Sequence, residues 1–360
     1  MGTSKKDLYE IKEISAGKDQ TLAVLNTGDV LGWGGAGSGR IAPFYVDICS
    51  SVSSSTEPVY ISKPSHYSTV STGFGISLGI SEQQVYIWGF CQIGIGGKQL
   101  FSEAPTLIDG LTGTSKIVAG QFIYAAIDQA GSVSTWGLNV DSALGRNTSQ
   151  VNSLPNKIAQ IPPMQELVIG DNFMIALSKD QRVYGWGSNS AGQLGLGHLH
   201  TVHSPEPLSI SASIKRIAIG STHVLALSNE GKVFGWGSNH YGQLGSSRQA
   251  HLNRPTPIAF PEKITALAAG MHYSLALSVS GRVYAWGWNG FGQLGLGDLQ
   301  SRRLPTVIPN LLGVRAIAAG EMHSLAIGKN HLLGWGNNES GQLGKAAIRQ
   351  TIPNPILTIA

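Results

Sequence analysis

Short runs of alternating apolar and polar residues recur along the whole chain, and one stretch shows the pattern most clearly. Residues 264–270 alternate and end at a glycine, which predicts a strand. Residues 274–277 and 282–286 predict two further strands joined by a tight turn at Gly281, and residues 305–308 predict a short outer strand that begins at a proline. The pattern therefore predicts four strands in about 50 residues, without the spacing typical of an amphipathic helix.

Two sequence markers repeat in phase with this unit. The dipeptide Trp-Gly occurs seven times at intervals of 48 to 55 residues, and a glycine precedes each of these tryptophans by 15 or 16 residues. The tryptophans are Trp33, Trp88, Trp136, Trp186, Trp236, Trp286 and Trp335, and the marker glycines are Gly17, Gly73, Gly120, Gly170, Gly220, Gly270 and Gly320. Because a period of this length is the signature of a repeat architecture, we predict seven copies of one four-stranded unit.

Four-stranded units that repeat radially form the blades of a β-propeller. We therefore expect an all-β protein, a single seven-bladed propeller over residues 1–360. The chain begins with an inner strand, whereas its last residues form a proline-marked outer strand. From this difference we expect N- and C-terminal strands to share one blade and close the ring. That first blade would consist of residues 7–34 and 352–360, with an insertion loop at about 35–57.

Composition agrees with this fold and argues against several other classes. Glycine contributes 47 of 360 residues, charged residues make up 13% and the net charge is +4, which excludes a coiled coil and a disordered chain. Only Cys49 and Cys91 are present, too few for a disulfide framework. Neither a long apolar run nor a basic block occurs, so we expect no membrane span, no nucleic-acid partner and a monomer.

The sequence offers little for covalent catalysis. It lacks a Gly-x-Ser-x-Gly nucleophile motif, and the glycine-rich run at 94–98 lacks the frame of a phosphate-binding loop. His198, His200 and His203 could offer three imidazoles to one metal ion, since alternate residues of an extended segment share a face, but no cysteine or carboxylate follows them until Glu206. We favour a solvated loop there and predict no catalytic residue, no metal and no cofactor.

A ten-residue string in the later repeats resembles a known family. Trp-Gly-x-Asn-x-x-Gly-Gln-Leu-Gly occurs at 186–195, 236–245, 286–295 and 335–344, whereas the first three repeats match it only in part. With the upstream glycine and Ala-Leu segments, it resembles the repeat of the RCC1 family, which is named for a regulator of chromosome condensation. The resemblance covers about residues 7–360 and implies a seven-bladed propeller, in agreement with the repeat count.

The loops of a propeller converge near its axis, and binding residues are usually found on such loops. The residues just after the marker glycines vary between repeats and are expected to crowd one face. The partner-binding residues predicted there are Asp19, Asp171, Asn172, His223, His272 and His323. Two interpretations stay open for the histidines at 223 and 323, which share a frame position: a hydrogen bond to the neighbouring blade, or a polar contact with a partner. The repeated Trp, Gly and Asn residues are assigned to packing and to loop hydrogen bonds.

The first repeat carries an insertion after its Trp-Gly. It has 24 residues between Trp33 and Pro58, against 18 between Trp286 and Pro305. The added segment has a glycine-rich stem and an apolar tip, and one interpretation is a disordered surface loop. The other comes from the resemblance, because a loop at a similar place in the family's founding member forms a β-wedge that displaces nucleotide from the small GTPase Ran. The residues that would form the wedge are Phe44, Tyr45 and Val46.

The resemblance implies a propeller that binds a small GTPase of the Ras superfamily, Ran being the first expectation, and promotes guanine-nucleotide exchange. Such exchange needs no cofactor, because tighter binding of the nucleotide-free state is sufficient. A non-catalytic protein-interaction scaffold is the first alternative. Chromatin binding is the second and is disfavoured, because the basic residues are scattered. The expected location is the cytoplasm or nucleus, or a host cell if the chain resembles the RCC1-repeat effectors that intracellular bacteria secrete.

Overall fold

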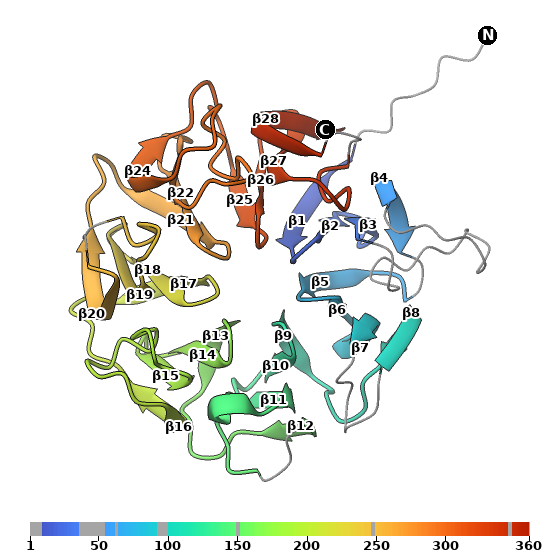
Figure 1. The fold of residues 1–360 in the computed structure, drawn as a ribbon. Helices are drawn as coiled ribbons and strands as arrows, with labels where there is room; N and C mark the ends of the chain where they lie inside the picture. Colours follow the sequence, from blue (N-terminus) through green and yellow to red (C-terminus); the bar gives the residue numbers. More distant parts are fainter. Residues whose placement is uncertain are drawn as a thin grey trace.

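The chain forms seven four-stranded antiparallel sheets arranged in a ring (Figure 1). The structure is a computed structural model that describes residues 9–35, 55–61, 64–91, 100–148, 152–245, 249–344 and 348–359. We number the sheets as blades 1 to 7 in chain order. The predicted all-β, seven-bladed propeller is confirmed. In the part of the chain that is described, no helix is both long and apolar enough to cross a membrane.

The strands of blades 1 to 3 are β1 (Ile11–Ala16), β2 (Gln20–Leu25), β3 (Val30–Gly34), β4 (Ser55–Ile61), β5 (Tyr67–Thr72), β6 (Ile76–Ser81), β7 (Gln84–Cys91), β8 (Leu100–Leu107), β9 (Thr114–Ala119), β10 (Ile123–Asp128), β11 (Val133–Leu138) and β12 (Asn152–Lys157). Those of blades 4 to 7 are β13 (Met164–Ile169), β14 (Phe173–Ser178), β15 (Val183–Gly187), β16 (Val202–Pro207), β17 (Ile214–Ile219), β18 (His223–Ser228), β19 (Val233–Ser238), β20 (His251–Ile258), β21 (Ile264–Ala269), β22 (Tyr273–Ser278), β23 (Val283–Gly287), β24 (Arg302–Val307), β25 (Ala316–Ala319), β26 (His323–Ile327), β27 (His331–Asn337) and β28 (Arg349–Thr358). A 3-10 turn, η2 (Val140–Ser142), lies in blade 3.

Every blade is built from consecutive strands, with the first nearest the axis and the fourth at the rim (Figure 1). The expectation that the two termini share one blade is therefore wrong. The outer strand of blade 1 is β4, and the last strand, β28, pairs with β27 inside blade 7. The proline-marked strand thus ends its own blade and does not begin the next one. The first and last described residues, Tyr9 and Ile359, form an isolated parallel bridge at the boundary between blades 7 and 1.

The Trp-Gly tryptophans form the core between blades and are fully buried. The indole Nε1 of Trp236 donates a hydrogen bond of 2.9 Å to the carbonyl of Gln193, in the Gly-Gln-Leu-Gly loop of the preceding blade. Trp286 repeats this contact with the carbonyl of Gln243 at 2.8 Å. Within the loop, the amide oxygen of Asn239 accepts the backbone N–H of Leu244 at 3.0 Å. The repeated motif therefore joins neighbouring blades, which confirms its assignment to packing and loop hydrogen bonds.

The marker glycines let the backbones of neighbouring blades approach closely. A Cβ atom at Gly73 would lie 2.1 Å from the carbonyl oxygen of Gly120, and one at Gly220 would lie 2.3 Å from that of Gly270. Only a residue without a side chain can occupy such a position unless the blades move apart.

Candidate partner-binding face

Two sets of loops share one end of the ring. The axial loops join the first and second strands of each blade and begin at the marker glycines, while the outer loops join the third and fourth strands. Both sets lie at the same end because the strands are antiparallel, and backbone hydrogen bonds tie them together. In blade 4 the N–H of Ser188 donates to the carbonyl of Asn172, and in blade 6 that of Trp288 donates to His272, both at 2.9 Å. We call this end of the ring the axial face.

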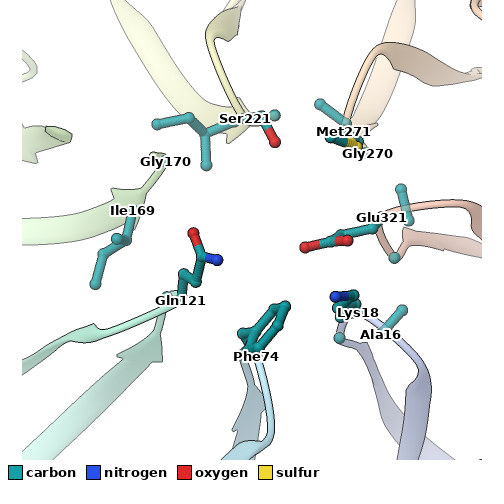
Figure 2. A pocket seen from close by; sticks show the side chains of 18 of the residues that line it. Ala16, Lys18, Phe74, Gln121, Ile169, Gly170, Ser221, Gly270, Met271 and Glu321 are labelled. Atoms are coloured by element: carbon teal, nitrogen blue, oxygen red, sulfur yellow. The ribbon is translucent and has the colours of Figure 1, made fainter. Parts of the chain in front are cut away.

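A pocket of about 140 Å³ opens on the axis of this face and is lined by the axial loops of all seven blades (Figure 2). Each blade contributes the residue that directly follows its marker glycine. These residues are Lys18, Phe74, Gln121, Asp171, Ser221, Met271 and Glu321. In Figure 2 the side chains of Gln121 and Glu321 point toward the centre. One position of the repeat thus supplies seven residues that line the same pocket.

Backbone hydrogen bonds between neighbouring axial loops hold this set in place. The N–H of Met271 donates to the carbonyl of Glu321 at 3.0 Å, and that of Asp171 donates to Ser221 at 2.9 Å. The N–H of Glu321 donates to the carbonyl of Gly17 at 3.2 Å and links blade 7 to blade 1. The pocket is therefore a preformed feature of the ring.

The pocket carries more negative charge than its own residues neutralise. Limited hydration raises the pKa of Glu321, and although Lys18 opposes this rise, Asp171 and Asp19 add to it. Loss of hydration also raises the pKa of Asp171, although a hydrogen bond with Ser221 opposes this rise. The ammonium of Lys18 lies 3.8 Å from the centre of the Phe74 ring. An additional cationic group would compensate the two carboxylates.

Asp19 lies beside the start of the insertion. Its carbonyl accepts the N–H of Gly35 at 2.7 Å, and a Cβ atom at Gly35 would lie 2.9 Å from the Asp19 carboxyl carbon. The chain therefore enters the insertion from the axial face. The predicted wedge residues Phe44, Tyr45 and Val46 lie outside the described residues. The expected bounds of 35–57 are too long, since strand β4 already begins at Ser55.

His223 and His323 do not reach the axial face, because both side chains are fully buried between blades. The Nε2 of His223 lies 3.0 Å from the hydroxyl of Ser274, and that of His323 lies 3.1 Å from the hydroxyl of Thr21. Each contact joins one blade to the next. Burial lowers the pKa of each imidazole to about 3, so both rings are neutral at pH 7. The geometry supports the blade-linking interpretation for both.

The remaining predicted residues, Asn172 and His272, lie on the axial face. Asn172 has a φ of 56°, a left-handed conformation that asparagine tolerates, and its carbonyl accepts the N–H of Ser188. His272 is half-buried and stacks on Tyr241, with 5.0 Å between the ring centres. The histidines of the blade 4 outer loop do not converge as a metal site would require. His198 stacks on His200, while His203 contacts the hydroxyl of Ser142 at 2.7 Å.

From the sequence, residues that follow the marker glycines, Lys18 and Glu321 among them, are expected to crowd one face with Asp171, but of these three only Asp171 is predicted to bind a partner. Phe74 is the residue that sequence reasoning missed, although it follows the marker glycine Gly73 in the same way.

Comparisons with known proteins identify the family. A sequence model described as the RCC1-like domain matches residues 91–359. The chain belongs to the RCC1-like domain family. Human WBSCR16 resembles this RCC1-like propeller with a TM-score of 0.81 and 21% identity, over 91% of this chain and 93% of that chain. Prp20p from Saccharomyces cerevisiae resembles it with a TM-score of 0.77 and 22% identity, over 88% and 82%. At these identities the likeness shows the fold alone. None of the curated protein sequences compared with this chain matches it.

Proposed function

We propose that this RCC1-like propeller binds a small GTPase of the Ras superfamily through its axial face and promotes release of the bound guanine nucleotide. Ran, or a GTPase like it, is the first candidate. The observation that carries the proposal is the lining of the axial pocket, which has two carboxylates, Asp171 and Glu321, and one ammonium, Lys18. The fold adds support, because Prp20p, which has a similar fold, binds Gsp1p and histones.

The chemistry of exchange requires binding alone. In a P-loop GTPase, a lysine and backbone N–H groups hold the nucleotide phosphates. A carboxylate that reaches this lysine replaces the phosphate charge, so it binds the nucleotide-free form more tightly than the nucleotide-bound form. Such differential affinity is sufficient to shift the equilibrium toward release. Asp171 and Glu321 gain from the same contact, because the ammonium supplies the compensation that the pocket lacks.

The test replaces the two pocket carboxylates by their neutral isosteres, Asp171→Asn and Glu321→Gln. Release of a fluorescent GDP analogue from Ran and from a panel of Ras-superfamily GTPases is measured with the intact protein and with this double variant. We expect the double variant to slow catalysed release at least tenfold, about 1.4 kcal/mol or more of lost differential binding. Asp180→Asn is the matched control, since Asp180 lies in the same blade as Asp171 but in the turn between β14 and β15, at the opposite end of the strands.

Equal release by the double variant and the intact protein would remove the pocket carboxylates from the mechanism. If the intact protein accelerates release from none of the GTPases, the exchange function is wrong. Binding that does not distinguish the nucleotide-free form from the nucleotide-bound form would identify an interaction scaffold.

A further inference from the structure

Four aromatic side chains meet on the axial face where the outer loops of blades 5 and 6 adjoin. Tyr241 comes from blade 5, and His272, Trp288 and Phe291 come from blade 6. The Tyr241 ring stacks on that of His272 with 5.0 Å between centres, and it lies 6.1 Å from Trp288. Trp288 contacts Phe291 edge-on at 5.7 Å and lies 6.5 Å from His272. We call these four residues the aromatic patch.

The outer-loop fold does not require aromatic residues at these positions. The residue two after the Trp-Gly tryptophan is Trp288 in blade 6 but serine in blades 4 and 5, at Ser188 and Ser238. The residue just before the Gly-Gln-Leu-Gly run is Tyr241 in blade 5 and Phe291 in blade 6, and it is Ala191 in blade 4 and Ser340 in blade 7. Blades 4 and 7 form the same loop, so packing within the loop does not explain the aromatic patch.

The aromatic patch is accessible to a partner. The Tyr241 side chain is 43% exposed, and the other three are half-buried. All eight tryptophans lie in described ranges, and the seven of the Trp-Gly set are fully buried, so Trp288 is the one that faces solvent. Tryptophan and tyrosine that are partly exposed beside a pocket are the residue types that dominate binding energy at protein interfaces.

The surroundings of the aromatic patch indicate the charge of its partner. On the inner side, His272 directly follows Met271, which lines the axial pocket with Asp171 and Glu321. Burial and the neighbouring His240 lower the pKa of His272, so its ring is neutral at pH 7 and does not repel a cation. On the outer side, the guanidinium of Arg303 donates to the carbonyl of His240 at 3.4 Å. Negative charge thus lies toward the axis and positive charge toward the rim.

One cation–π contact already occurs on the axial face. The Lys18 ammonium lies over the face of Phe74 in the axial loop of blade 2, near the pocket carboxylates. Tryptophan binds a cation over its ring most strongly, and tyrosine and phenylalanine also do so. Trp288 and Tyr241 lie on the same face as Phe74. No lysine or arginine of the described chain is recorded over either ring.

We propose that the aromatic patch docks a protein segment that carries a lysine or arginine beside an apolar side chain, with the cation over Trp288 and Tyr241 and turned toward the pocket carboxylates. The identity of the partner rests on the proposed function, in which this segment belongs to the GTPase and the aromatic patch provides its apolar anchor. The chemistry of the segment rests on the aromatic patch itself and is tested without a GTPase.

Trp288 provides the readout, because acrylamide quenches exposed tryptophans and the other seven are buried. The probes are two blocked pentapeptides without aromatic residues, Lys-Leu-Arg-Leu-Lys and its acidic counterpart Glu-Leu-Glu-Leu-Glu. We expect the cationic peptide to reduce the acrylamide quenching of the accessible component at least twofold at saturation, and the acidic peptide to leave it unchanged. Trp288→Ser, which installs the residue of blades 4 and 5, identifies this component by removing it.

Two further variants separate the aromatic patch from general surface effects. Tyr241→Ala, which installs the residue of blade 4, retains the Trp288 reporter and should weaken binding of the cationic peptide at least fivefold. Leu312→Ser removes a 69% exposed apolar side chain between β24 and β25, at the opposite end of the strands, and should leave binding unchanged. Equal protection by both peptides, protection by neither, or unchanged binding in Tyr241→Ala would overturn the proposal. Absence of nucleotide release from every GTPase, with the peptide result intact, would refute the proposed function alone.

Discussion

In four of the seven blades, the third residue after the marker glycine makes a polar side-chain contact with the next blade. In blades 5 and 7 it is a histidine that contacts a hydroxyl of the following blade. In blade 6 it is Tyr273, whose hydroxyl donates to the carbonyl of Gly320 at 3.1 Å, and in blade 1 it is Gln20, whose amide lies 3.3 Å from the hydroxyl of Ser77. The sequence shows this shared position, but it does not show which group of the next blade the side chain contacts.

The two buried histidines predict an acid-sensitive fold. Their folded pKa is about 3, below the ordinary value of 6.5 that applies when the chain unfolds. Between these values the unfolded chain binds more protons, so stability falls as the pH drops below 6.5, with a limiting slope of about 1.4 kcal/mol per pH unit for each histidine. Urea unfolding from pH 7.5 to pH 4.5 measures the slope.

The control is the double variant His223→Gln and His323→Gln, because Gln20 fills the same position in blade 1. Glu13 and Glu166 have raised pKa values and act in the opposite direction, but they are common to both proteins and cancel in the comparison. The variant should lose less stability than the wild type as the pH falls below 6.5. Parallel pH profiles would show that the histidines do not titrate between the folded and unfolded states.

At the scale of elements, alternation and glycine spacing predicted the inner three strands well. In blade 6 the predicted strands at 264–270, 274–277 and 282–286 agree with β21, β22 and β23 to within a residue or so. The outer strand β24 begins at Arg302, three residues before the predicted start. Outer strands have one solvent-exposed edge and face, so their apolar pattern is weak and their ends are set by pairing with the third strand. The axial pocket assembles from seven loops, which no single stretch of sequence reveals.

The insertion of blade 1 is the element that would distinguish an exchange factor from a scaffold. Deleting residues 39–47 should reduce GTPase nucleotide release to its intrinsic rate while retaining affinity to within about fivefold, because an apolar tip that contacts only the nucleotide-free partner supplies differential affinity. Fluorescent-nucleotide release and equilibrium binding are measured on the same protein.

A length-matched variant, with Phe44, Tyr45 and Val46 all changed to serine, separates the tip from the length of the loop. This variant should lose the acceleration of nucleotide release, as the deletion variant does. Release that survives both changes would exclude this loop from the mechanism, whereas loss in the deletion alone would assign the effect to loop length.

At the scale of the whole molecule, the sequence predicted the number of blades but not where each blade begins. A cyclic repeat can be divided before any of its four strands, and the pattern inside the unit is the same for every division. The pairing of β28 with β27 shows that each blade ends with the proline-marked strand. The ring is therefore closed by packing between complete blades, with Ile11, Trp33, Leu332 and Ile359 in one buried cluster at the boundary.

This boundary predicts a position-dependent cost along the C-terminal segment. Ile359 is 2% exposed and packs into the cluster between blades 7 and 1, so Ile359→Ala should lower the free energy of unfolding by roughly 2–5 kcal/mol. Ile352 lies in β28 of the same blade but is 52% exposed, so Ile352→Ala should change it by no more than about 0.5 kcal/mol. Chemical denaturation compares the two, and equal losses would mean that the boundary cluster does not hold the ring together.

Each blade is one uninterrupted stretch of chain. The order of the blades along the chain can therefore be changed without moving a strand from one sheet to another. Tyr9 and Ile359 are already bridged, so a short linker could join these two residues, and new ends could be placed at any connection between blades without dividing a sheet. Any such circular permutant would keep all seven sheets intact, because each cut falls between the outer strand of one blade and the inner strand of the next.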